Sequence, residues 1–182
     1  VALLLREVRN RLGKATGNNA LDGYQSHSAE RVAAMVIALY ETLQGFSISY
    51  AETPASFEET GQKIRMPDRV LGEQLANCLD MTVLVAACLE QMGLHPLLVV
   101  VRGHAFPGVW LVDERFPEGV VGDAARLRTR AALGELLFFD SSTIMHAPAP
   151  PFSVARTVAT EALKSEDTFV FAIDVRTARL DR

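Results

Sequence analysis

A long apolar helix followed at once by a buried strand is the feature that most constrains the fold of this chain. Residues 77–92 repeat apolar side chains such as Met81 and Val85 with helical spacing. Gly93 follows, at the position where helices commonly end in the left-handed region. Residues 97–101 are an unbroken run of leucine and valine, typical of a strand that is buried on both faces. The pattern predicts a core in which this helix packs on a sheet.

The remaining apolar patterns place helices mainly before the sheet. The chain order predicts an α+β fold with N-terminal helices packed on a small antiparallel sheet. Helical patterns cover residues 1–13, 29–44 with Ser28 as N-cap, 67–71, 123–133 with Asp123 as cap, and 153–164. Strand patterns cover residues 46–50, 97–101, 104–112, 136–139 and 169–175.

Length and charge narrow the class of protein. A chain of 182 residues with 49% hydrophobic and 22% charged residues suits one globular domain rather than a disordered segment. We divide it into a helix and linker (1–28), a core (29–146) and a helix–strand extension (147–182) of the same domain. No apolar run is long enough to span a membrane, and a net charge of −4 does not favour direct nucleic-acid binding. The first residue is valine, so we expect a fragment of a longer protein.

The two cysteines, Cys78 and Cys88, both fall in the central helical pattern. Ten residues at about 1.5 Å each separate them by roughly 15 Å, beyond the ~7 Å limit for a disulfide. A disulfide scaffold is therefore excluded, and a reducing, cytoplasmic setting is expected. No histidine shows zinc spacing with either cysteine, and no glycine-rich phosphate loop is present, so we expect no metal and no cofactor.

Cys78, His104 and Asp140 could form a catalytic set. Cys78 starts the central helix, where the helix dipole acidifies a thiol, whereas Cys88 lies mid-helix like an inert core cysteine. His104 starts one predicted strand and Asp140 ends another, so the three can meet at one edge of the sheet. The alternatives are a cysteine used for packing, a histidine satisfied by backbone groups and an aspartate that forms a turn.

The chain resembles the transglutaminase-like cysteine-peptidase superfamily in two segments, Asn77-Cys78-Leu79-Asp80-Met81-Thr82 and Gly103-His104-Ala105-Phe106, and in the long helix and strand between them. The resemblance covers roughly residues 29–145. It implies a papain/transglutaminase-like fold with Cys78 as nucleophile, His104 as base and Asp140 as the carboxylate that orients the base. The chain resembles more closely the transglutaminase-like domains embedded in large bacterial proteins with helicase and nuclease modules. This second resemblance rests on Arg65-Met66-Pro67 and on residues 103–110 and 171–175.

The chain departs from the family pattern in two ways. Ala76-Asn77 precede the cysteine where many members have a glycine, and a predicted helix lengthens the gap from His104 to Asp140. Asp113, at the end of the His104 strand, is therefore a rival for the third role. Gln74 is a candidate oxyanion donor beside the backbone N–H of Cys78, or else a solvated residue of the preceding turn.

The resemblance implies cysteine-dependent acyl transfer on the amide bond of a peptide or protein, with hydrolysis by a peptidase or amidase favoured over cross-linking. The alternative is an inactive module of the same fold that binds or scaffolds within a larger, DNA-related protein, where other domains of the parent chain are its partners. Substrate specificity would lie in loops 51–65 and 113–122.

Overall fold

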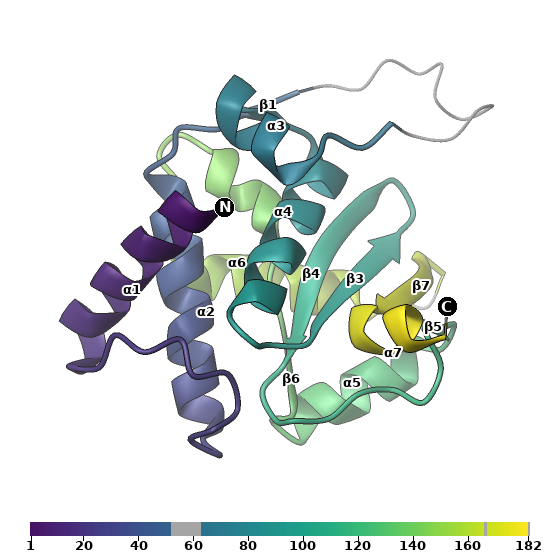
Figure 1. The fold of residues 1–182 in the computed structure, drawn as a ribbon. Coiled ribbons are helices and arrows are strands. Elements are labelled where there is room, and N and C mark those ends of the chain that lie inside the picture. Colours follow the sequence, from purple (N-terminus) through teal and green to yellow (C-terminus); the bar gives the residue numbers. More distant parts are fainter. Residues whose placement is uncertain (52–62, 166, 182) are drawn as a thin grey trace.

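A central helix, α4 (Cys78–Gln91), lies between other helices and a five-stranded sheet (Figure 1). The structure is a computed structural model that describes residues 1–51, 63–165 and 167–181. The other α-helices are α1 (Ala2–Thr16), α2 (Ala29–Gln44), α3 (Pro67–Glu73), α5 (Ala124–Ala132), α6 (Phe152–Ala162) and α7 (Val175–Leu180). The strands are β1 (Ser49–Tyr50), β2 (Leu75–Ala76), β3 (Pro96–Val101), β4 (His104–Trp110), β5 (Val120–Val121), β6 (Leu136–Phe138) and β7 (Phe169–Asp174), and a 3-10 helix, η2 (Ser141–Met145), follows β6.

Helix α4 begins and ends where its sequence predicts. Asn77 is the N-cap: its side chain accepts a hydrogen bond from the backbone N–H of Asp80, and the Asp80 carboxylate accepts one from the N–H of Asn77. This reciprocal capping box satisfies two of the N–H groups left free at a helix start. The helix closes at Met92, and Gly93 follows with a φ of 76°, a conformation that costs glycine little.

The sheet is antiparallel throughout, in the order β5-β7-β3-β4-β6. Its central strand, β3, turns Leu97 and Val99 into a core shared with Trp110, which is fully buried. The opposite face of β3 carries Leu98 and Val100, and both stay half-buried. The prediction of burial on both faces of this strand is thus right for one face and wrong for the other. The chain has a mixed α and β fold with an antiparallel sheet, as its element order predicts.

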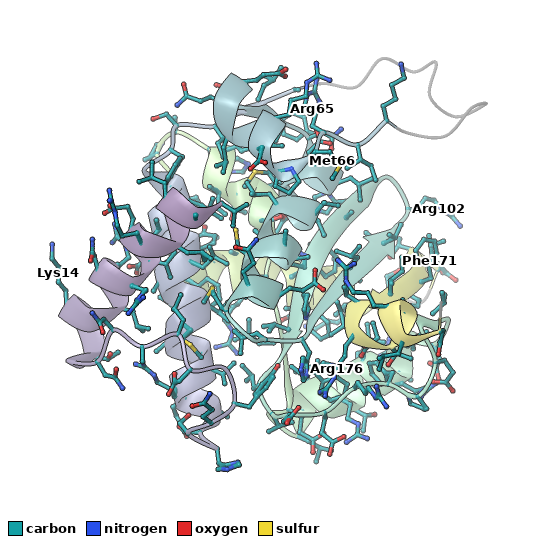
Figure 2. The ribbon with its side chains drawn as sticks, in the orientation of Figure 1. Lys14, Arg65, Met66, Arg102, Phe171 and Arg176 are labelled. Carbon is teal, nitrogen blue, oxygen red and sulfur yellow. The ribbon has the colours of Figure 1, made fainter. Side chains whose placement is uncertain are left out.

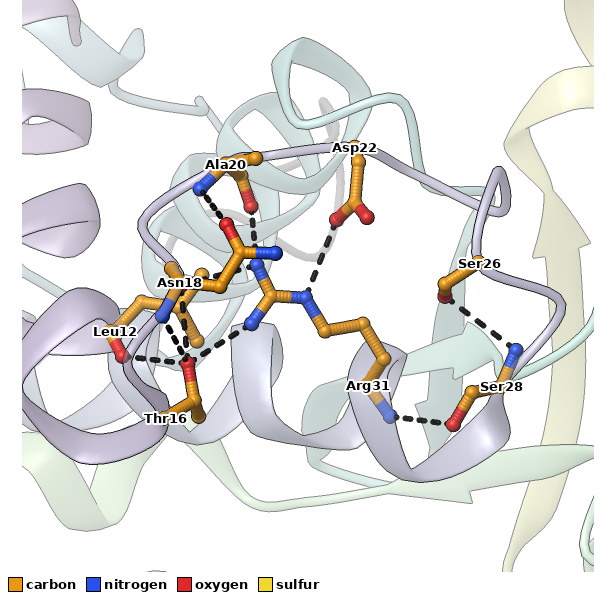
Figure 3. A network of polar contacts seen from close by, with 8 residues as sticks. All are labelled: Leu12, Thr16, Asn18, Ala20, Asp22, Ser26, Ser28 and Arg31. Carbon is orange, nitrogen blue, oxygen red and sulfur yellow. Dashed lines mark hydrogen bonds and ion pairs between the residues drawn. The ribbon is translucent and has the colours of Figure 1, made fainter.

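The linker after α1 is held firmly against α2. Helix α1 extends three residues beyond the predicted segment, to Thr16, and stops at Gly17 with a φ of 75°. The guanidinium of Arg31 then donates hydrogen bonds to the carbonyl oxygens of Asn18 (3.1 Å) and Ala20 (2.7 Å) (Figure 3). It also donates to the hydroxyl of Thr16 and the carboxylate of Asp22. One arginine side chain therefore fixes the path of the linker.

Arg31→Ala is expected to lower the free energy of unfolding by about 1.5–3 kcal/mol, because hydrogen bonds to a charged group in a partly buried place are strong. Urea denaturation would measure the change. Arg11→Ala is the matched control: Arg11 pairs with Glu41 while both side chains are more than 40% exposed, 47% and 43%. Such exposed pairs contribute about 0.2–1 kcal/mol. Equal losses in the two variants would contradict this role of Arg31.

Several short elements have no counterpart in the sequence prediction. Strand β5 lies inside the polar loop predicted at 113–122, and helix α7 follows directly from β7. Asp174 ends β7 and caps α7. Its carboxylate accepts hydrogen bonds from the indole N–H of Trp110 and from the backbone N–H groups of Phe116 and Thr177. Most of the predicted specificity loop at 51–65 lies outside the described residues. Among the described helices, none is long and apolar enough to cross a membrane.

Candidate active site

The structure brings Cys78, His104 and Asp140 together at one edge of the sheet. Cys78 is the first residue of α4, His104 is the first residue of β4, and Asp140 follows β6 as the N-cap of η2. The Nε2 atom of His104 lies 2.9 Å from Oδ2 of Asp140. The imidazole also serves the thiol, since the side chains of His104 and Cys78 share a hydrogen bond. The sulfur, the ring and the carboxylate therefore form one chain.

The environment of Cys78 favours its thiolate. Burial alone raises the pKa of this thiol, but a hydrogen bond from His104 and the backbone N–H groups of Ala105 and Leu79 outweigh it, so the pKa of Cys78 falls below its ordinary value. The N-terminus of α4 contributes through the N–H of Leu79 in its first turn and through the helix dipole. Cys88 shows the opposite behaviour: burial raises its pKa to about 12. The fold thus distinguishes the two cysteines chemically.

The imidazole is held in its protonated form. Hydrogen bonds to Asp140 and then to Cys78 raise the pKa of His104 to about 10, against the opposing effect of burial. Burial raises the pKa of Asp140, but the hydrogen bonds from His104 and Ser142 lower it below its ordinary value. A thiolate–imidazolium pair beside an ionised carboxylate is the arrangement that cysteine nucleophiles use.

Ser142 and Thr143 hold Asp140 in place. The backbone N–H and the hydroxyl of Ser142 donate to Oδ1 of Asp140 at 2.8 and 2.7 Å, which leaves Oδ2 for His104. The hydroxyl of Thr143 donates to the carbonyl oxygen of Asp140, and the N–H of Asp140 donates to the carbonyl of Ala155 on α6. The sequence analysis missed these supports. An aspartate followed by Ser-Ser-Thr after a strand is the signal that could have shown them, because such hydroxyls cap turns.

The rival candidates lie elsewhere. Asp113 forms an ion pair with Arg176 (2.7 Å) and lies 3.7 Å from the His95 ring, whereas Asp140 is the partner of His104. Gln74 adopts a left-handed conformation at the end of α3, and its amide donates to the carbonyl of Phe46 at 2.7 Å. That contact turns the amide NH2 group, the donor that an oxyanion would need, toward Phe46.

Within residues 1–51, 63–165 and 167–181, no three histidine, cysteine or acidic side chains gather as a metal site would require. No family model matches the chain, and neither a curated protein nor a solved structure matches it.

Proposed function

We propose that this chain is a cysteine hydrolase or acyltransferase that acts on amide bonds, with a papain/transglutaminase-like fold. The observation that carries the proposal is the hydrogen-bonded chain from Cys78 through His104 to Asp140, with an acidified thiol at the start of a helix. The roles are those that the sequence resemblance implies. The substrate is the amide of a peptide or protein.

The first half of the reaction forms a thioester. The Cys78 thiolate attacks the carbonyl carbon of the amide, and the carbonyl oxygen becomes an oxyanion that the backbone N–H of Cys78 can bind. His104 then donates the proton on its Cys78-facing nitrogen to the leaving amine as the C–N bond breaks. Asp140 keeps the ring in place through Nε2. The products of this step are a free amine and an acylated cysteine.

The second half regenerates the enzyme. His104, now neutral, accepts a proton from water as the water oxygen attacks the thioester carbon. The C–S bond breaks, the acid is released, and the thiolate–imidazolium pair re-forms. A second amine in place of water would give cross-linking. Water is always present as an acceptor, which favours a peptidase or amidase.

Alkylation by iodoacetamide tests the proposal directly. At pH 7, Cys78 should be modified much faster than Cys88, because the first thiol is acidified and half-exposed while the second is buried. Mass spectrometry of peptides from the folded protein, sampled over time, would follow each cysteine separately. An inert Cys78, or equal rates at both positions, would remove the nucleophile and favour the binding or scaffolding alternative. A probe with a peptide amide and a thiol-reactive group would extend the test to acyl transfer.

A further inference from the structure

A buried carboxylate lies in the same helical turn as the proposed nucleophile. Asp80 is fully buried, two residues after Cys78. Its oxygens accept three hydrogen bonds: from the backbone N–H of Asn77 at 3.1 Å, and from the backbone N–H and Nη1 of Arg65 at 2.7 and 2.8 Å. A buried anion at this position would oppose ionisation of the neighbouring thiol unless a positive charge balanced it.

Arg65 supplies that positive charge from a different part of the chain. It precedes α3, on the segment that runs past the N-terminal end of α4 (Figure 2). Its side chain is 27% exposed and its Nε also lies 3.8 Å from Glu73 on α3. Arg65 therefore contacts the Asp80 carboxylate with both backbone and guanidinium, one on each oxygen.

We propose that Arg65 is a positioning residue for the proposed acyl-transfer reaction: by neutralising Asp80, it removes a buried negative charge from beside the Cys78 thiolate. The inference rests on the proposed function, because it concerns the ionisation of the same thiol. Asp80 is needed at this place for the capping box that starts α4. Arg65 allows the helix to keep this carboxylate cap while its first residue carries a negative charge.

The expected effect is large enough to measure. By Coulomb's law, two unit charges about 5–8 Å apart interact at an effective dielectric constant near 20 by one pKa unit or more. Asp80 lies two residues after Cys78 in the first turn of α4, so a charge change there should be felt by the thiol. Arg65→Gln keeps the backbone N–H and much of the side-chain length but removes the charge. Its Cys78 should show an apparent pKa about one unit higher than the unchanged protein, so alkylation at a pH below that pKa should slow about tenfold.

A double-variant cycle separates charge from structure. Iodoacetamide alkylation of Cys78 would be followed from pH 5 to pH 9.5 in the unchanged protein, Arg65→Gln, Asp80→Asn and the variant with both changes. Asp80→Asn leaves the arginine charge unopposed, so it should lower the apparent pKa of Cys78. The combined variant should return close to the unchanged protein. A purely structural role would make both single changes act in the same direction and the combined change act at least as strongly.

Two further variants complete the test. Arg65→Lys retains a positive charge and should shift the apparent pKa less than half as far as Arg65→Gln. Arg69→Gln, which changes an arginine paired with Glu73 on the surface of α3, should leave the apparent pKa unchanged. An unchanged apparent pKa in Arg65→Gln would overturn the proposal, as would an increase in Asp80→Asn. The Asp80→Asn measurement tests the role of Arg65 even if Arg65→Gln fails to fold. If Cys78 of the unchanged protein does not react preferentially, the proposed function itself fails; if it does, only the role of Arg65 is at stake.

Discussion

His104→Ala is expected to shift the alkylation profile of Cys78 to higher pH and to slow its modification at pH 6 by at least about tenfold. In the unchanged protein the pKa of Cys78 is lowered and that of His104 is raised to about 10, so both shifts favour the thiolate–imidazolium pair at neutral pH. Removing the imidazole removes both the hydrogen bond and the positive charge. Burial, the largest influence on this thiol and one that raises its pKa, then acts with less opposition.

Turnover of any amide substrate should fall further, by about 10²–10⁴-fold, because His104 also supplies general acid and base catalysis. Rates of Cys78 alkylation from pH 5 to pH 10 would measure the shift. His95→Ala is a matched control, because the His95 ring contacts the carbonyl oxygen of Glu114 and the guanidinium of Arg176. Superimposable profiles for His104→Ala and the unchanged protein would show that the histidine does not serve the thiol.

Cys78→Ala should abolish acyl transfer and leave the domain nearly as stable as before, whereas Leu89→Ala on the same helix should lose about 2–5 kcal/mol of unfolding free energy. Cys78 is only half-buried and loses one heavy atom, so little cavity forms. Removing a thiolate from a functional site can even increase stability. Leu89 is fully buried in the main core, where truncation leaves a cavity.

Urea denaturation of the two variants beside the unchanged protein would test the contrast in stability. Labelling with a thiol-reactive peptide probe would test the activity. Cys88→Ala is the cysteine control, since it should retain the labelling at Cys78 while it loses a buried side chain. If Cys78→Ala destabilised the domain as much as Leu89→Ala, and the unchanged protein took up no probe, Cys78 would be a packing residue.

The sequence was most informative where one periodic pattern decides both type and length of an element. Helix α2 was predicted with its N-cap at Ser28, and the structure has the same bounds. The central helix was predicted from Asn77 to Met92, and these two residues are its caps. The juxtaposition of Cys78, His104 and Asp140 was expected as one of two interpretations, because a helix start, a strand start and a strand end can share one edge of a small sheet.

The rest depended on contacts between distant parts of the chain. A two-residue strand such as β5 has no periodicity, and it exists because Val121 pairs with Ala172. The ion pair of Arg65 with Asp80 joins two segments whose sequences do not point to each other. The hydrogen bond from Gln74 to Phe46 likewise joins the end of α3 to the segment that follows α2. Sequence periodicity therefore predicts the longer helices and strands, whereas contacts between distant segments depend on tertiary packing.

The position of β7 in the sheet has a consequence for the order of folding during synthesis. This strand, Phe169–Asp174, pairs with residues 97–101 of β3, which emerges from the ribosome far earlier. The hairpin of β3 and β4 can form early because its partners are joined by two residues, whereas the other edge of β3 stays unpaired until residue 174 has been made. Helix α6 and its carbonyl contact to Asp140 also come late. A nascent chain therefore carries an open strand edge until synthesis reaches β7, and this is the interval in which protection by a chaperone would matter most.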